Sequence, residues 1–218
     1  MAPVKTILTT MLWLTAACAQ AVLTVSQTFS PAVDIPAGNP VGVVASGNFT
    51  GANPSDEVLG ITVGLSISGG YNGSLYAYLV APNGTLVVLM NRPGVSVDGF
   101  GAESSGMNIT LSDAGGASLQ NVTGGFGTSL TGTYQADQTL GTLGNSSANG
   151  TWDIYFADLC SGGGDPVLNS FTLNIEVVPE PVTPALLIFL AVGLGWTGFR
   201  SALRARRAKR AAEPASSI

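Results

Sequence analysis

Apolar residues recur at every second position in the middle of the chain, and this alternation constrains the fold more than any other feature. The clearest runs are Ile61–Ser68, Trp152–Ala157 and Phe171–Val177. In each run, apolar side chains alternate with small or polar ones. Because successive side chains of a strand point to opposite faces of a sheet, a period of two predicts strands with one buried face.

Shorter runs and turn signals fill the space between these strands. The shorter candidate strands are Pro40–Ala45, Ser74–Val80, Leu86–Met90, Asn108–Leu111 and Gly132–Tyr134. Turns rich in Gly and Asn separate them, whereas the segments 93–106 and 121–132 are interpreted as loops. No segment before Val182 has a convincing helical period. The pattern therefore predicts an all-β domain, an antiparallel β-sandwich of jelly-roll type.

The first 21 residues have the pattern of a signal peptide. Lys5 supplies a positive charge, Ile7–Ala17 is mostly apolar, and the small residues Ala19 and Ala21 offer cleavage sites. An uncleaved membrane anchor and a lipoprotein signal ending at Cys18 are the alternatives. Export is predicted in each case, with a folded body that spans residues 22–177.

The charge of the body narrows the kinds of partner it can have. Residues 22–178 contain one basic residue, Arg92, against eleven acidic ones, a net charge of −10. Phosphate binding needs a cationic face, so a nucleic-acid role is excluded. Free carboxylates are the ligands that calcium prefers.

The residue types that most enzymes need are missing or unplaced. The chain has no histidine. This excludes a Ser-His-Asp triad, a Cys-His pair and His-ligated zinc. A pair of carboxylates could still hydrolyse a glycoside, but nothing singles out two of the eleven acids. Asp56 and Glu57 are adjacent and are interpreted as a solvated turn. We therefore expect a protein that is not an enzyme.

Two segments of the body resemble the P domain, also called the P/Homo B domain. Ile61–Gly94 resembles its opening half and Asn149–Ile175 its closing half. The resemblance implies a jelly-roll sandwich in which Trp152, Ile154 and Phe156 belong to the core. In proprotein convertases such a domain stabilises a subtilisin-like protease.

Some bacterial P domains bind calcium, and the resemblance implies a calcium site in this chain. Asp158 and Asp165 match acidic positions on either side of the last turn. The turn before Leu75 commonly reads Asp-Gly-Asp-Leu in relatives, whereas here it reads Asn72-Gly73-Ser74-Leu75. Two charges are therefore missing at that place.

The C-terminal segment 178–218 resembles the PEP-CTERM sorting signal of Gram-negative bacteria. A proline motif precedes 18 uncharged residues, 182–199, long enough for a short transmembrane helix. The motif is Val178, Pro179, Glu180 and Pro181. A basic cluster follows, which predicts that the body lies outside the membrane. Its members are Arg200, Arg204, Arg206, Arg207, Lys209 and Arg210.

The resemblance implies processing by exosortase and an association with exopolysaccharide or biofilm. A plain tail anchor is the alternative. We expect an exported surface or extracellular-matrix protein whose sandwich binds a partner, with exosortase, exopolysaccharide or a secreted protease as candidate partners. The alternative function is an accessory domain that acts in trans on a secreted subtilisin-like protease. Four aromatic residues are candidates for ligand contact: Tyr71, Tyr76, Tyr78 and Phe100.

Overall fold

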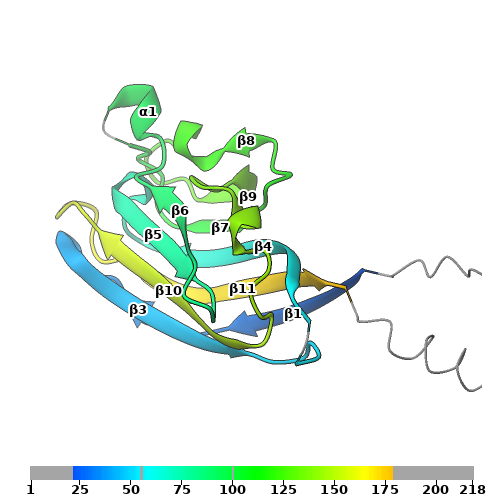
Figure 1. The fold of residues 1–218 in the computed structure, drawn as a ribbon. Helices are drawn as coiled ribbons and strands as arrows, with labels where there is room; N and C mark the ends of the chain where they lie inside the picture. Colours follow the sequence, from blue (N-terminus) through cyan, green and yellow to red (C-terminus); the bar gives the residue numbers. More distant parts are fainter. Residues whose placement is uncertain (1–21, 55, 100, 179–218) are drawn as a thin grey trace, which may run out of the picture. The chain divides into compact units, whose positions relative to one another are not determined.

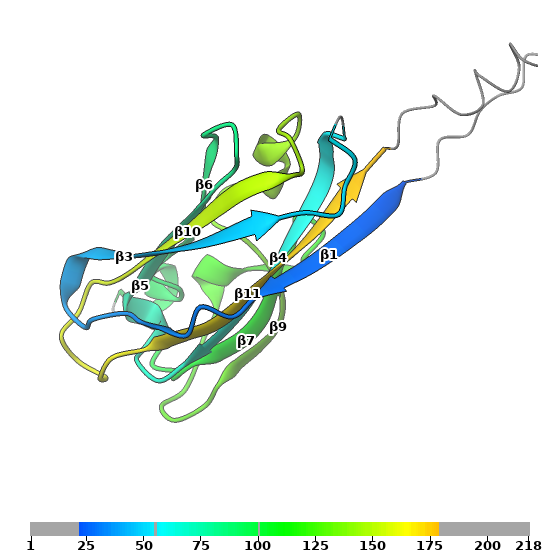
Figure 2. The same cartoon turned by 90° about the horizontal axis from the view of Figure 1, so that it is seen from below.

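The described part of the chain forms two β-sheets that face each other across one hydrophobic core (Figures 1 and 2). The computed structural model describes residues 22–54, 56–99 and 101–178. The signal peptide 1–21, the motif residues 179–181, the helix 182–199 and the basic cluster 200–210 are predictions that lie outside these residues. No helix within the described residues is long and apolar enough to cross a membrane.

The larger sheet has seven strands and contains both ends of the body. Leu23 pairs with Val177, so the first and last long strands are neighbours. The order across the sheet is β1 (Leu23–Phe29), β11 (Val167–Val177), β4 (Val58–Ser68), β7 (Met107–Leu111), β9 (Leu130–Gln135) and β8 (Ala117–Ser118), with β2 (Val33–Asp34) also paired to β11. β11 ends at Val177, as the prolines that follow it predict.

The smaller sheet has four strands, and several of the connections between the two sheets contain a short helical turn. Its order is β3 (Asn39–Phe49), β10 (Gly150–Asp158), β5 (Leu75–Val80) and β6 (Leu86–Asn91). The helical segments are α1 (Val95–Asp98) and the 3-10 helices Asn72–Ser74, Leu119–Asn121 and Leu140–Leu143. All pairings in this sheet are antiparallel.

The core consists of the apolar side chains that the period of two places inward. Trp152, Ile154 and Phe156 are fully buried, and the intervening Tyr155 is only partly covered. Trp152 also donates its Nε1 hydrogen to the carbonyl of Ala148 over 3.1 Å. The prediction of an all-β fold is therefore confirmed. In these strands the apolar side chains at every second position are the ones buried on the inner face of the sheet.

Two details of the predicted fold are wrong. The sequence predicts an antiparallel sandwich, but β9 runs parallel to both β7 and β8. Alternation reports which face of a strand is buried and not the direction of its neighbour. The segment 93–106, interpreted as a loop, contains the four-residue helix α1. This helix is too short to show a helical period in the sequence.

The edges of the two sheets meet along β1 and β3. The side chain of Gln27 donates to the carbonyl of Asn48 over 3.1 Å and accepts from the N–H of Thr50 over 2.9 Å. Two residues further along β1, the ring of Phe29 stacks on Phe171 with centroids 4.8 Å apart. The sandwich is thereby closed on this side by side chains and not by a continuous ladder of backbone hydrogen bonds.

Candidate binding sites

A cluster of three tyrosines lies on the outer face of the four-stranded sheet. Tyr155 of β10 lies directly across from Tyr78 of β5. Their rings stack with centroids 4.5 Å apart and 13° between the planes. The ring of Tyr76 packs edge-on against both, with its centroid 6.2 Å from that of Tyr78 and 6.3 Å from that of Tyr155. Since the neighbours of Tyr155 along β10 point into the core, this cluster faces away from it.

Aliphatic side chains extend the cluster across the sheet. Val44 of β3 pairs with Tyr155 and is 57 % exposed, while Leu86 of β6 is 45 % exposed. We call Tyr76, Tyr78, Tyr155, Val44 and Leu86 the tyrosine surface. Exposed apolar and aromatic side chains that gather in one place are typical of contact surfaces.

A glycine and a hydrogen bond hold Tyr155 in position. Its hydroxyl donates to the carbonyl of Pro40 over 2.7 Å, so the ring crosses β3. It crosses at Gly42, where a Cβ would lie 2.6 Å from the ring and its oxygen, and where φ is +65°. Burial raises the pKa of the Tyr155 hydroxyl, and the neighbouring Tyr78 and Tyr76 raise it further.

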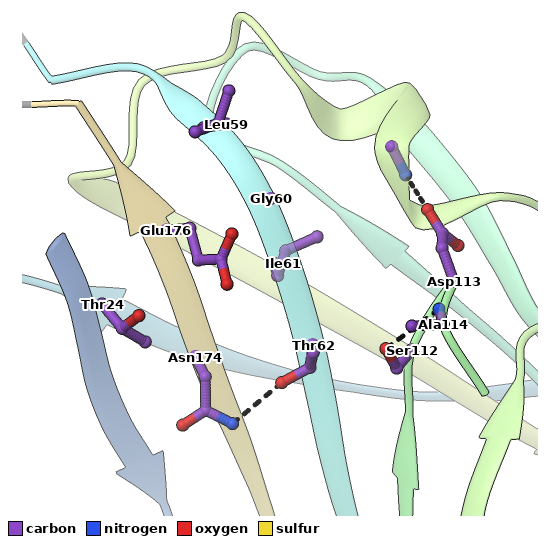
Figure 3. A pocket seen from close by; sticks show the side chains of 11 residues that line it. Thr24, Leu59, Gly60, Ile61, Thr62, Ser112, Asp113, Ala114, Asn174 and Glu176 are labelled. Carbon is purple, nitrogen blue, oxygen red and sulfur yellow. Dashed lines mark hydrogen bonds between the residues drawn. The ribbon is translucent and has the colours of Figure 1, made fainter. Parts of the chain in front are cut away.

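A shallow groove lies on the outer face of the other sheet. Its volume is about 380 Å³, and side chains of β1, β11, β4 and the segment after β7 line it. Figure 3 shows Thr24, Asn174, Glu176 and Thr62 along the three adjacent strands, with the side-chain amide of Asn174 donating to Thr62 over 3.0 Å. Asp113, at the far side, is already engaged: its two carboxylate oxygens accept the backbone N–H groups that open the 3-10 helix Leu140–Leu143.

The two predicted calcium ligands differ in their surroundings. Asp158 is fully buried at the end of β10. Its Oδ1 accepts from the N–H of Cys160 over 3.0 Å, and its Oδ2 is buried without a hydrogen-bond partner among the described residues. Asp165 is exposed, and its Oδ1 accepts from the N–H of Ala37 over 2.8 Å. Among the described residues, no three His, Cys, Asp or Glu side chains gather in a group that could hold a metal ion.

The turn Asn72–Ser74 lies next to Asp158 in the fold, because Asp158 pairs with Leu75. Asn72 is fully buried and donates its amide to Ser104 and to the carbonyl of Gly106, each over 2.8 Å. The hydroxyl of Ser74 donates to the carbonyl of Tyr71 over 2.8 Å. At positions 72 and 74 the chain therefore has neutral side chains that form hydrogen bonds within the chain itself.

Asp56 is not part of a solvated turn, so this interpretation of the sequence is wrong. It is 1 % exposed, and its Oδ2 accepts from both the backbone and the side-chain amide of Asn53, over 2.9 and 3.0 Å. Its backbone carbonyl accepts from Ala148, the residue that also binds Trp152. Asp56 therefore braces the loop before β4, whereas the adjacent Glu57 is exposed.

The aromatic candidates from the sequence do not all meet. Tyr76 and Tyr78 lie together in the tyrosine surface. Tyr71 is not part of this surface; its ring packs against Phe126, with the two centroids 6.3 Å apart. Phe100 lies outside the described residues. Sequence reasoning missed Tyr155, although its place between the core residues Ile154 and Phe156 predicts an outward side chain.

Comparisons with known proteins find distant similarity only. No family model and no curated protein matches the chain. A crystal structure of the Aeromonas sobria serine protease in complex with its chaperone aligns with 73 % of the chain at a TM-score of 0.47 and 13 % identity. A structure of the same serine protease aligns with 72 % at a TM-score of 0.44 and 14 % identity. The alignments cover 28 % and 27 % of those chains, so this chain spans little more than a quarter of their length.

Proposed function

We propose that this chain is an exported, non-catalytic module that docks a partner protein through the tyrosine surface. The observation that carries the proposal is the row formed by Val44, Tyr155 and Tyr78 across β3, β10 and β5. Tyrosine is enriched at protein interfaces because it combines a large apolar ring with a polar tip. The absence of histidine from the sequence supports a binding role over hydrolysis.

The packing of the rings favours a protein as the occupant. A sugar ring or a planar ligand would stack on an open aromatic face. Here the rings of Tyr78 and Tyr155 face each other, and Tyr76 packs edge-on against the pair. Stacking covers one face of each of these two rings and so reduces the open aromatic surface, which lies beside the exposed aliphatic groups of Val44 and Leu86. A mixed surface of this kind suits the apolar side chains and backbone groups of another protein.

The partner that we propose is a secreted subtilisin-like serine protease, bound in trans. This is the partner class that the resemblance to the P domain implies. A body with a net charge of −10 would meet a less acidic or basic face of the protease, and this attraction would speed association at low salt.

The experiment is a direct binding assay with a purified subtilisin-like protease secreted by the same cells. Calorimetry would compare the unaltered chain with Val44→Ser and Tyr78→Ala. We expect each substitution to weaken binding by about tenfold or more, because each removes apolar contact area from the tyrosine surface. Ser66→Ala, on the outer face of the other sheet, is the matched control and should leave the Kd unchanged. Absence of binding, or equal losses in all three variants, would reject the proposal.

We further propose that exosortase processes the chain at the Val178–Pro181 motif and leaves the body at the surface or in the extracellular matrix of a Gram-negative bacterium. The support is the order of motif, apolar segment and basic cluster in the sequence. Mass spectrometry of the mature protein tests it. A C-terminus within or next to the motif is expected, whereas a mature protein that still ends at Ile218 would contradict processing. Association with exopolysaccharide is a separate expectation, and the tyrosine surface is not evidence for it.

Calcium is proposed at Asp158. A buried carboxylate oxygen without a partner is costly unless it binds a proton or a cation, and Asp158 Oδ2 is such an atom among the described residues. Asp165 would be a second, weaker ligand, since one of its oxygens already binds Ala37. The neutral Asn72 and Ser74 fit a site of reduced charge, and we expect correspondingly weak binding.

A further inference from the structure

The outer face of the seven-stranded sheet carries an ordered set of hydroxyl and amide groups. Ser26 donates to Asn174 over 2.6 Å, and Asn174 in turn donates to Thr62 over 3.0 Å. Thr28 and Thr172 share a hydrogen bond of 2.8 Å. These contacts link β1, β11 and β4 through their side chains. The polar groups are therefore held in place before any ligand arrives, which lowers the entropy cost of binding.

Glycines in β4 turn this face into a trough. Gly60 and Gly64 lie where outward side chains would otherwise stand, next to Glu176 and Thr172 on β11. A Cβ at Gly60 would come within 3.0 Å of the Glu176 carboxylate. The groove of about 380 Å³ beside Gly60 and a second hollow of about 240 Å³ beside Gly64 share Asn174 in their linings. The two hollows therefore follow one line along the sheet, which suits an extended ligand.

The charge of the lining decides the class of ligand. Among the described residues, no lysine or arginine lines either hollow, and Glu176 places an exposed carboxylate in the first. An anionic ligand would be repelled. Of the two carboxylates that line the hollows in the described part of the chain, Asp113 already accepts a backbone hydrogen bond at each oxygen, which leaves Glu176 for a metal ion. Hydroxyl and amide groups both donate and accept, as do the hydroxyls of a sugar.

We propose that this trough binds a segment of a neutral, unbranched polysaccharide. Glu176 accepts hydrogen bonds from sugar hydroxyls, Asn174 and Thr62 exchange hydrogen bonds with them, and the exposed Leu59 contacts the apolar face of a sugar ring at one end. This site goes beyond the proposed docking of a protein, since it uses the other sheet and other residues. A chain with both sites would hold a partner protein near a glycan surface.

The experiment is calorimetric titration of the full-length chain with neutral hexasaccharides, namely cellohexaose, laminarihexaose, maltohexaose and mannohexaose, and with an anionic guluronate hexasaccharide. We expect at least one neutral probe to bind with a Kd below about 1 mM and the anionic probe to bind at least tenfold more weakly. Failure of all four neutral probes to bind, or equal binding of the anionic probe, would overturn the proposal.

Three variants locate the site. Gly60→Val fills the trough and should abolish binding of the neutral probe. Because this change could also disturb β4, Asn174→Ala provides a second test in a partly exposed side chain, with an expected loss of about tenfold. Tyr78→Ala, which should impair docking of the protease, is the control and should leave glycan binding unchanged. If Tyr78→Ala removes glycan binding while Asn174→Ala does not, the trough is not the site.

Discussion

Tyr155 serves two purposes at once. Its ring completes the tyrosine surface by stacking on Tyr78, and its hydroxyl fixes that ring to β3 through Pro40. Both roles depend on Gly42, which leaves room for the ring and adopts a φ that other residues rarely take. A side chain on the outer face of the sheet thus determines the shape of the proposed docking surface.

The titration of Tyr155 tests this arrangement. Burial, with further contributions from Tyr78 and Tyr76, raises its pKa above the ordinary value of 10.0. The folded protein therefore holds this proton more tightly than the unfolded chain does. The resulting contribution to stability is complete below pH 10 and is lost as the pH rises through the raised pKa. Ultraviolet absorbance titration should show one late-titrating tyrosine that disappears in Tyr155→Phe. An unchanged titration curve in that variant, apart from its total amplitude, would contradict the raised pKa.

Trp152 offers a test of the core. The residue is fully buried, and its indole donates a hydrogen bond to Ala148. Trp152→Phe removes both ring volume and this donor, so we expect the free energy of unfolding to fall by about 1–3 kcal/mol. Urea denaturation followed by circular dichroism measures the loss. A change within about 0.5 kcal/mol, the range usual for surface positions, would mean that the core repacks around the smaller ring.

At the scale of elements, the sandwich is closed by the contact of β1 with β3. Gln27 forms hydrogen bonds with the backbone on both sides of Phe49, the last residue of β3, while Phe29 packs against Gly47. Side-chain groups that bind an exposed edge reduce its tendency to pair with another chain. This closure also joins the first strand of the body to the sheet that carries the tyrosine surface.

Gly47→Ala should disturb this closure. The added Cβ would lie 2.6 Å from the ring of Phe29, which is itself stacked on Phe171, so one of the aromatic rings must move. Overpacking of this kind costs about 1–3 kcal/mol. The matched control is Gly116→Ala, where nothing lies within 4 Å of the new atom. Thermal unfolding should separate the two variants, and equal midpoints would show that the contact of Phe29 with β3 is loose.

The long strands could be predicted from the sequence because their inner faces are almost purely apolar. β4, β10 and β11 show this most clearly. β1 was not predicted, since an edge strand buries little: only Val25 and Phe29 of its apolar residues pack against the core. The tyrosine surface depends on which strands become neighbours, and a period of two carries no information about pairing. Thus Tyr76 and Tyr78 were predictable as candidates, whereas their contact with Tyr155 was not.

At the scale of the molecule, the acidic body should repel itself. The single basic residue in residues 22–178 stands against eleven acidic ones. Added salt shortens the Debye length from about 30 Å at 0.01 M to about 10 Å at 0.1 M and screens this repulsion. We therefore expect the thermal midpoint to rise with sodium chloride. A midpoint that falls or stays constant over this range would show that the acidic side chains are already separated or neutralised.

Calcium chloride at the same ionic strength distinguishes a bound ion from screening. If calcium binds Asp158, it should raise the midpoint above the sodium chloride value, because an ion that binds only the folded state stabilises it. Asp158→Asn keeps an oxygen for the N–H of Cys160 but removes the charge at Oδ2. This variant should lose the response to calcium and, without calcium, should be at least as stable as the unaltered protein, since no unpaired buried charge remains. Equal midpoints in the two salts would reject the calcium site. A calcium response that persists in Asp158→Asn would place the ion elsewhere.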